Sequence, residues 1–206
     1  MKWQVSRWSR LVVVVVVLAA GVVVAGPAGP SGSAGADVAA AIARAQAALV
    51  KREWSAVIGA LSEGLRVARN EAPLQISRVV VVDGPHTGLG VYQTLPGGVV
   101  RERRLRLYVE VENLVARPLA DGRSELSLDV TGHFSAVAAE GAREPLGKKS
   151  LGAQQVQTHR ASGVHSFGVD VSLGPDAPAG AYVVDVEVAD RVGGKSARVP
   201  VSFALP

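Results

Sequence analysis

Apolar and polar residues alternate with a period of two over most of the chain from residue 74 onward. This period is typical of β-strands, because successive side chains point to opposite faces of a sheet. Strands are expected at eight places: 76–82, 90–95, 105–113, 124–132, 146–156, 166–173, 181–188 and 196–203. Turn signals rich in glycine, proline and aspartate separate them. The sequence therefore predicts that residues 74–206 form an antiparallel sandwich of seven or eight strands.

Before the strands, apolar residues recur every three or four positions, which is typical of helices. One stripe is made of Val38, Ile42, Ala45 and Leu49, and a second of Trp54, Ile58, Leu61, Leu65 and Ala68. Asp37 can cap the first helix, expected over 38–51, and Pro73 should end the second. Because few residues join the two, residues 37–72 are expected to form an antiparallel hairpin whose stripes are buried against each other.

The N-terminus is predicted to be a secretory signal helix followed by a flexible linker, together spanning residues 1–36. Residues 1–10 carry three basic residues and no acidic one, and the run 11–25 is entirely apolar. Cleavage is expected at 23–25 or at 34–36, where small residues occur. An uncleaved membrane anchor remains the alternative, although the run is shorter than the ~20 residues that cross a bilayer.

The segment 52–65, with Trp54, Leu61, Gly64 and Leu65, resembles the second helix of a tetratricopeptide unit. It departs from that family in the first helix, where Ala41 and Ala48 replace large residues. One repeat cannot form a peptide-binding solenoid, because stacked neighbours supply its core. The hairpin is therefore expected to pack on the β-domain.

The run 178–203 resembles the last two strands of bacterial immunoglobulin-like modules, with a Pro-Ala-Gly corner that leads into Tyr182. That resemblance implies an immunoglobulin-like sandwich in which Tyr182 stabilises the corner. Together with 90–92 and 107–113, the same run is similar to the C-terminal domain of uncharacterised exported proteins of bacteria. This resemblance implies a fold rather than an activity, since such sandwiches host unrelated functions.

Charge and cysteine content exclude several classes of partner and site. The formal net charge is +4, but three of the 22 basic residues lie in the expected leader, which leaves 19 basic against 18 acidic residues. A nearly neutral mature protein has no general attraction to phosphate backbones, so nucleic acid is not an expected partner. The chain has no cysteine, which excludes disulfides, thiolate metal sites and a lipid anchor on cysteine.

No motif in the sequence demands a catalytic chemistry or a bound metal. The four histidines, His86, His133, His159 and His165, lack ligand spacing, and no aspartate-rich calcium loop, nucleophilic elbow or phosphate loop is present. The chain is therefore predicted to be no enzyme and to carry no cofactor or metal.

The densest charge cluster is made of Arg101, Arg103, Arg104 and Arg106. With Tyr92 it is a candidate partner surface for an anionic ligand. The alternative is a solvated strand edge that resists aggregation. In that alternative the strand pleat divides the arginines between two faces, and Glu110 and Glu112 neutralise them.

These observations favour an exported, non-enzymatic interaction or scaffolding protein of the bacterial cell envelope, in the periplasm or outside the cell. Its expected partner is another envelope protein, held at a strand edge or in the groove between hairpin and sandwich. One alternative is a polysaccharide-binding module with Tyr92, Tyr108 or Trp54 stacked on sugar rings, and another is an accessory subunit of an exported complex. Membrane contact is expected only through the N-terminal segment, if it is uncleaved.

Overall fold

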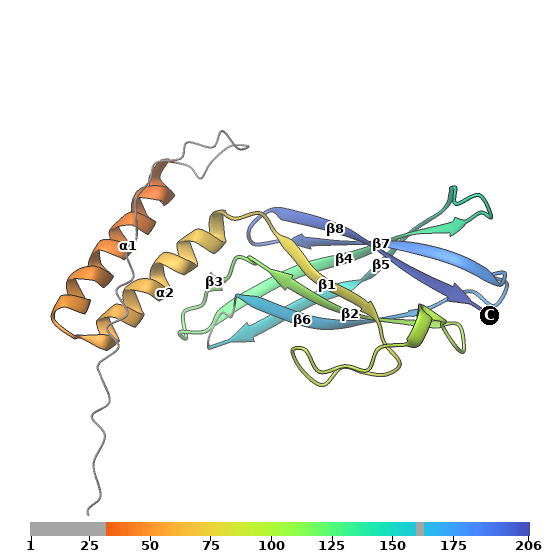
Figure 1. The fold of residues 1–206 in the computed structure, drawn as a ribbon, viewed down its shortest axis with the longest axis horizontal. Helices are drawn as coiled ribbons and strands as arrows, with labels where there is room; N and C mark the ends of the chain where they lie inside the picture. Colours follow the sequence, from red (N-terminus) through yellow and green to blue (C-terminus); the bar gives the residue numbers. More distant parts are fainter. Residues whose placement is uncertain (1–31, 160–162) are drawn as a thin grey trace, which may run out of the picture.

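Two helices precede eight strands in the computed structural model, which describes residues 32–159 and 163–206 (Figure 1). The helices are α1 (Gly32–Val50) and α2 (Trp54–Glu71), and a short 3₁₀ turn, η1, spans Pro96–Gly98. The strands are β1 (Gln75–Val81), β2 (Arg104–Glu112), β3 (Arg117–Pro118), β4 (Ser124–Val137), β5 (Arg143–Thr158), β6 (Val164–Ser172), β7 (Gly180–Asp190) and β8 (Lys195–Leu205). The signal helix expected in the first 31 residues lies outside the described residues. Within the described part of the chain, no helix is long and apolar enough to cross a membrane.

The strands form two sheets in which every pairing between named strands is antiparallel. One sheet has the order β1-β2-β6. The other has the order β5-β4-β7-β8, and the short β3 pairs with the first two residues of β4. The prediction of a mainly β, antiparallel fold preceded by two helices is confirmed.

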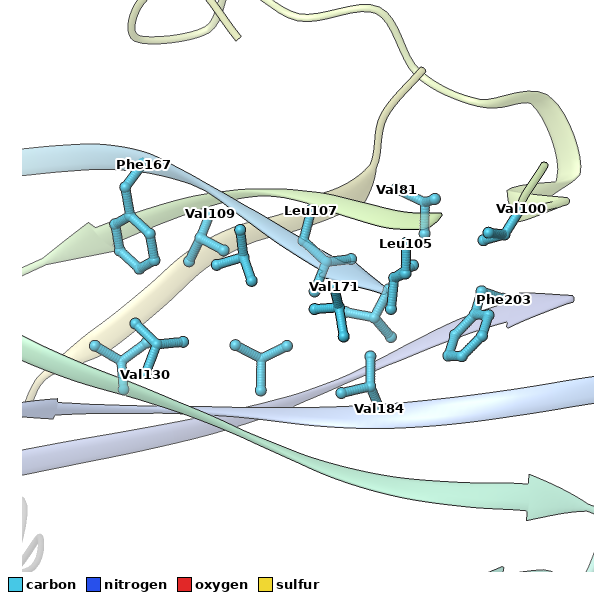
Figure 2. Packing of buried hydrophobic residues seen from close by; sticks show 14 of the residues in the cluster. Val81, Val100, Leu105, Leu107, Val109, Val130, Phe167, Val171, Val184 and Phe203 are labelled. Carbon is cyan, nitrogen blue, oxygen red and sulfur yellow. The ribbon is translucent and has the colours of Figure 1, made fainter. Parts of the chain in front are cut away.

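The core lies between the two sheets (Figure 2). Leu105, Leu107, Val109 and Val111 of β2 alternate along the strand and are each at most 1% exposed. Valines of β7 face them from the other sheet: Val184, Val186 and Val188. β-branched side chains have one strongly preferred χ1 rotamer and pack well on a pleated surface, so a core rich in valine stabilises these strands.

The expected strand at 90–95 is wrong, because this segment is part of a loop that covers the outer face of β2. Tyr108 points to that outer face, opposite to its core neighbours, and is nevertheless fully buried. The Gly90 N–H donates a hydrogen bond to the Tyr108 hydroxyl, 2.7 Å between the heavy atoms, and Tyr92 stacks on the Tyr108 ring. Gly90 has a φ of 72°, which departs from strand geometry. The loop is thus positioned by side-chain contacts from a distant strand.

The start of the first helix also differs from the prediction. α1 begins at Gly32, five residues before Asp37, so the second expected cleavage site at 34–36 lies within the helix. The sequence contains no proline between Pro30 and Pro73 that would interrupt a helix. Burial of Ala34 within the folded hairpin accompanies this early start.

Candidate functional site

The hairpin is held together by small residues. α1 buries Ala34, Ala41, Ala45 and Ala48, whereas Gly64 is the buried residue of α2 among those described. A Cβ atom added to Gly64 would lie 3.0 Å from the Ala41 Cβ, so the two helices approach each other closely at this point. The interface is therefore narrow, and it leaves little room for large side chains.

Seven large apolar side chains of the hairpin are consequently exposed, and we call six of them, all but Val50, the apolar face. Its members are Ile42 (47% exposed), Leu49 (48%), Trp54 (62%), Ile58 (65%), Leu61 (51%) and Leu65 (49%). The expectation that the two stripes bury each other is wrong. Ala45 is the one buried member of the first stripe. Ala41 and Ala48 of α1 and Gly64 of α2 lie to one side of the stripes, and they bring the helices together.

The two stripes meet on one side of the hairpin. Val38 and Ile42 of α1 line a groove of about 260 Å³ together with Leu61 and Leu65 of α2. Leu49 lies two turns after Ile42, and Trp54 and Ile58 precede Leu61 at helical spacing, so all belong to the same side. The apolar face is therefore continuous across both helices.

The hairpin is attached to one end of the sandwich and does not lie on a sheet (Figure 1). Lys195 of β8 donates hydrogen bonds from Nζ to the carbonyl oxygens of Arg69 (3.0 Å), Ala72 (2.7 Å) and Asn113 (3.2 Å). Asn113 in turn donates from Nδ2 to the carbonyl of Pro73, at 3.0 Å. These contacts form a clasp that satisfies carbonyl groups at the end of α2, which have no partner within the helix. The expectation that the hairpin packs on the β-domain is wrong.

Burial lowers the pKa of the Lys195 ammonium, and the carboxylates of Asp190 and Glu71 oppose this shift. A partly dehydrated cation donating to backbone carbonyls at a helix C-terminus is electrostatically favourable, because the helix dipole is negative at that end. The clasp therefore fixes the direction in which α2 leaves the sandwich.

A hollow of about 740 Å³ separates α2 from the loop that carries β3. Leu65, Arg66 and Arg69 line it on the helix side, and Leu114 and Pro118 line it on the sandwich side. Leu65 also lines the groove of the hairpin, so the apolar face continues into this hollow. The groove expected between hairpin and sandwich is therefore present as a space.

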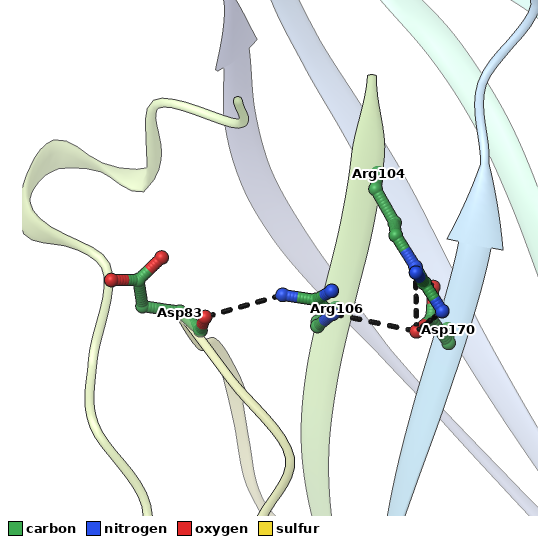
Figure 3. Close-up of polar contacts among 4 residues, drawn as sticks. All are labelled: Asp83, Arg104, Arg106 and Asp170. Carbon is green, nitrogen blue, oxygen red and sulfur yellow. Dashed lines mark hydrogen bonds and ion pairs between the residues drawn. The ribbon is translucent and has the colours of Figure 1, made fainter. Parts of the chain in front are cut away.

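Two arginines of the predicted surface, Arg104 and Arg106, both contact Asp170 (Figure 3). Arg104 donates from Nε to Asp170 Oδ1 at 2.7 Å, and its Nη2 lies 2.7 Å from Oδ2 of the same carboxylate. Arg106 lies 3.4 Å from Asp170 and donates from Nη1 to the Asp83 carbonyl at 3.2 Å. Arg104 and Arg106 thus share the outer face of β2, as residues two apart on a strand do. The expectation that the pleat divides the four arginines is wrong, because Arg101 and Arg103 precede the strand.

The expected neutralisation by Glu110 and Glu112 is also wrong, because the acidic partner comes from another strand. Asp170 of β6 lies directly opposite Arg106 in the register of the two strands. Hydrogen bonding from Arg104 lowers the pKa of Asp170. Glu110 instead accepts a hydrogen bond from the Tyr108 hydroxyl at 2.7 Å and lies 3.6 Å from Arg78.

The other two arginines lie in the turn before β2. Arg103 donates from Nη1 to the carbonyls of Gly174 (3.1 Å) and Ala177 (2.6 Å), which holds the neighbouring loop. Arg101 is exposed in the same turn. The four arginines therefore do not present their charges together to one partner.

The tyrosines expected as sugar platforms are occupied within the protein. Tyr92 is half-buried, with its ring stacked 4.3 Å from that of the buried Tyr108, and its hydroxyl accepts a hydrogen bond from Arg78. Trp54 alone among the three expected platforms is largely exposed. It lies on the hairpin, far along the chain from the two tyrosines, so the three do not form one aromatic surface.

Two further predicted positions have local roles. Tyr182 donates from its hydroxyl to the Pro178 carbonyl at 2.6 Å and stacks on Phe203, which ties the loop before β7 to the core. His133 Nε2 lies 2.8 Å from the Glu187 carboxylate across the β4–β7 pairing. No group of three or more His, Asp or Glu within residues 32–159 and 163–206 is arranged to hold a metal ion.

Comparison with known proteins gives no family. No protein-family model matches the chain, and no curated protein matches it. Weak likenesses exist among solved structures. The alkylpurine DNA glycosylase AlkC of Pseudomonas fluorescens, bound to DNA containing an abasic site analog, has a TM-score of 0.37 at 16% identity over 69% of this chain and 32% of that one.

Two other solved structures have similar scores. A FixG-related protein from Vibrio parahaemolyticus has a TM-score of 0.33 at 15% identity over 65% of this chain and 97% of its own. The sporulation control protein Spo0M from Bacillus subtilis has a TM-score of 0.32 at 11% identity over 65% of this chain and 49% of its own. The chain thus spans about a third of AlkC and half of Spo0M.

The feature that sequence reasoning missed is the exposure of the apolar face. A signal for it was present in the first helix, where Ala41, Ala45 and Ala48 stand at helical spacing, and in the second, where Gly64 follows Ala60. Such residues at three- and four-residue intervals allow close helix contact and compete with the larger stripes for the interface. The alanine pattern therefore indicated which side of each helix faces the other.

Proposed function

We propose that this chain is an exported, non-enzymatic interaction protein of the bacterial cell envelope that uses its helical hairpin as the docking element. The observation that carries the proposal is the apolar face, with six large side chains exposed on a hairpin that the Lys195 clasp holds at one end of the sandwich. An apolar face in this position is accessible to another protein.

The size of the apolar face supports a docking role. Each of its side chains is about half exposed or more, so each forgoes roughly 1 kcal/mol of stabilisation that burial would provide. Monomeric proteins rarely expose contiguous apolar patches of more than a few hundred Å², and larger ones mark interaction sites. Covering this face with a partner would recover part of that free energy.

The sandwich acts in this proposal as an immunoglobulin-like scaffold. Its sheets, β1-β2-β6 and β5-β4-β7-β8, correspond to the A-B-E and C′-C-F-G strands of such domains. Tyr182 near the start of β7 bonds the backbone four residues upstream, as a corner tyrosine does near the start of strand F. These two features support the assignment of the sandwich as a rigid support for the hairpin.

Export is proposed from the sequence alone. The three basic residues of 1–10 and the apolar run 11–25 have the order of a secretory leader. The absence of cysteine is compatible with an oxidising compartment, since no thiol would be open to oxidation there.

The proposed partner is a protein, because the apolar face offers contacts that a polysaccharide does not use. Sugar binding commonly relies on exposed aromatic rings with polar groups beside them. Tyr108 is fully buried here, and Tyr92 packs on it. We therefore place the proposed docking site on the hairpin and not at the tyrosines.

The docking role can be tested in the producing bacterium by site-specific photo-crosslinking. A photoreactive amino acid is placed at Leu61, in the apolar face, or at Val50, which is 86% exposed but lies on another side of α1. We expect a discrete cross-linked protein from position 61 and none from position 50, with the product identified by mass spectrometry. Equal labelling at both positions, or none at position 61, contradicts the proposal.

Export is tested separately by fusing residues 1–36 to alkaline phosphatase, which is active only after export. Phosphatase activity from the fusion, and its loss when Lys2, Arg7 and Arg10 are changed to glutamate, is the expected result. An inactive fusion would place the protein inside the cell and contradict the proposed compartment.

A further inference from the structure

We propose that the partner of the hairpin is a second copy of this chain, and that two hairpins pack their apolar faces together into a four-helix bundle. The inference rests on the docking role proposed above and names the occupant of that site. Three features of the described residues carry it: the spacing of the apolar side chains, the distribution of charge around the hairpin, and the size of the exposed area.

The spacing of the stripes is that of helix bundles. In α2 the apolar residues Trp54, Ile58, Leu61 and Leu65 are separated by four, three and four positions, and Ala68 follows three positions later. Such a repeat averages 3.5 residues and forms the seam of left-handed bundles, in which side chains of one helix fit between those of another. In α1 the same spacing joins Val38, Ile42, Ala45 and Leu49.

One hairpin supplies only half of such a bundle. In a four-helix bundle, each helix packs against two neighbours around a shared core. Here α1 and α2 pack on each other through Ala41, Ala45 and Gly64, and the seam of α2 faces solvent. A second hairpin placed on the apolar face would supply the two missing helices.

The charged side chains of the described hairpin lie outside the apolar face, with Arg66 and Arg69 beside Leu65 at its edge. Glu63 accepts hydrogen bonds from Arg66 at 2.6 and 3.0 Å, and Arg44 of α1 lies near enough to lower the pKa of Glu63 as well. The apolar face itself contains no charged residue, and Ser55 and Ser62 adjoin it on α2. Two identical faces can therefore meet without like charges being brought together, which is a requirement for pairing about a two-fold axis.

The exposed area is sufficient for a reversible dimer. Each of the six side chains is exposed by about half or more, which leaves on the order of 100 Å² of apolar area apiece, or roughly 600 Å² per protomer. Stable complexes bury about 800 Å² per partner, and transient ones bury less. We therefore expect a dimer that dissociates at micromolar protein concentration.

The first test measures mass against concentration for the protein as it is recovered from an expressing bacterium. Sedimentation equilibrium between about 1 and 100 µM should show a monomer at the low end and twice the monomer mass at the high end. Ile58→Glu places a charge on a side chain that is already 65% exposed, so the monomer should fold, and we expect dimer affinity to fall at least about tenfold. Val50→Glu, the same chemical change away from the apolar face, should leave the affinity unchanged.

Tryptophan fluorescence gives an independent readout. The chain has three tryptophans, of which Trp3 and Trp8 lie in the expected leader. With both changed to phenylalanine, Trp54 is the only source of tryptophan emission whether or not the leader is removed. Its emission should shift to shorter wavelength as concentration rises, because the dimer removes the ring from water, and Ile58→Glu should abolish the shift.

Cross-linking tests the geometry. Because the chain contains no cysteine, Leu61→Cys introduces a unique thiol within the apolar face, and Val50→Cys is its matched control. Mild oxidation should give a covalent dimer from the first variant and not from the second. Dimers formed equally by both variants, or association that Ile58→Glu leaves unchanged, would place the contact elsewhere and overturn the inference.

The outcomes also separate this inference from the docking role. A protein that stays monomeric at about 100 µM while Leu61 cross-links to a different protein in the cell overturns the dimer and leaves the docking role standing. A monomer whose position 61 cross-links to nothing overturns both.

Discussion

Replacing Lys195 with methionine should loosen the end of α2 while the sandwich stays folded. Methionine keeps the length and apolar stem of lysine but cannot donate a hydrogen bond. The carbonyls of Arg69, Ala72 and Asn113 would each lose a donor that now lies 2.7 to 3.2 Å away. The perturbation therefore removes the clasp without creating a large cavity.

The free energy that Lys195→Met should cost at the end of α2 can be estimated from these hydrogen bonds. Hydrogen bonds to charged groups contribute about 1.5–3 kcal/mol each, but Lys195 is only half-buried and its carbonyl partners regain water when it is removed. The lowered pKa of Lys195 shows that burial of its charge offsets part of the gain. A net loss of roughly 1–2 kcal/mol, confined to the last turn of α2, is the expected result.

Hydrogen exchange resolves where the loss occurs. Amides in the last two turns of α2 should exchange about 5- to 30-fold faster in Lys195→Met, and amides of β4 and β7 should be unchanged. Lys149→Met is the matched control, because the hydrogen bond of Lys149 to the Ser172 carbonyl is long, at 3.4 Å, and lies far from α2 in the sandwich. Unchanged exchange in α2, or equal effects of the two substitutions, would refute the role assigned to the clasp.

Three further predictions concern the sandwich. Tyr182→Phe removes the hydrogen bond to Pro178 and should lower the free energy of unfolding by about 1 kcal/mol in urea titrations. Gly132→Val should lower it by about 1–3 kcal/mol, because even a Cβ there would lie 2.9 Å from the Phe134 ring. Burial, and secondarily His86, lowers the pKa of His165, so the unfolded chain binds this proton first and stability should fall as pH drops below about 6.5. His165→Gln should remove that part of the pH dependence in thermal denaturation, and an unchanged pH profile would contradict it.

The strands could be predicted from the sequence because their physical cause is local. A period of two with valine at alternate positions requires only that one face be buried, and β2 and β7 satisfy this with Leu105 and Val184 in the core. The loop around Gly90 could not be predicted, because its position depends on Tyr108, a residue of a later strand that points away from the core. The short β3 was also missed, since two residues are too few to show a period.

For the candidate sites, too, the residues could be identified from the sequence but their tertiary contacts could not. The arginine cluster was visible as a cluster, but its partner Asp170 lies 64 residues after Arg106 and meets it only through strand register. The apolar residues of the hairpin were identified, whereas their exposure depends on which side of each helix packs. That choice is made by close contact at Gly64 and Ala41, a tertiary effect that hydrophobic spacing alone does not describe.

The clasp and the proposed dimer act on the same element, and this connects their energetics. Most of the stability of a helix in a protein comes from packing of its apolar face, and the alanine and glycine interface between α1 and α2 removes little apolar area from water. A second hairpin would bind only the folded form and so stabilise it by mass action. Lys195→Met frays the helix one turn beyond Leu65, which lies in the apolar face, so it should weaken dimerisation although Lys195 lies outside that face. Lys149→Met should leave dimerisation unchanged, since the hydrogen bond of Lys149 to the Ser172 carbonyl lies within the sandwich.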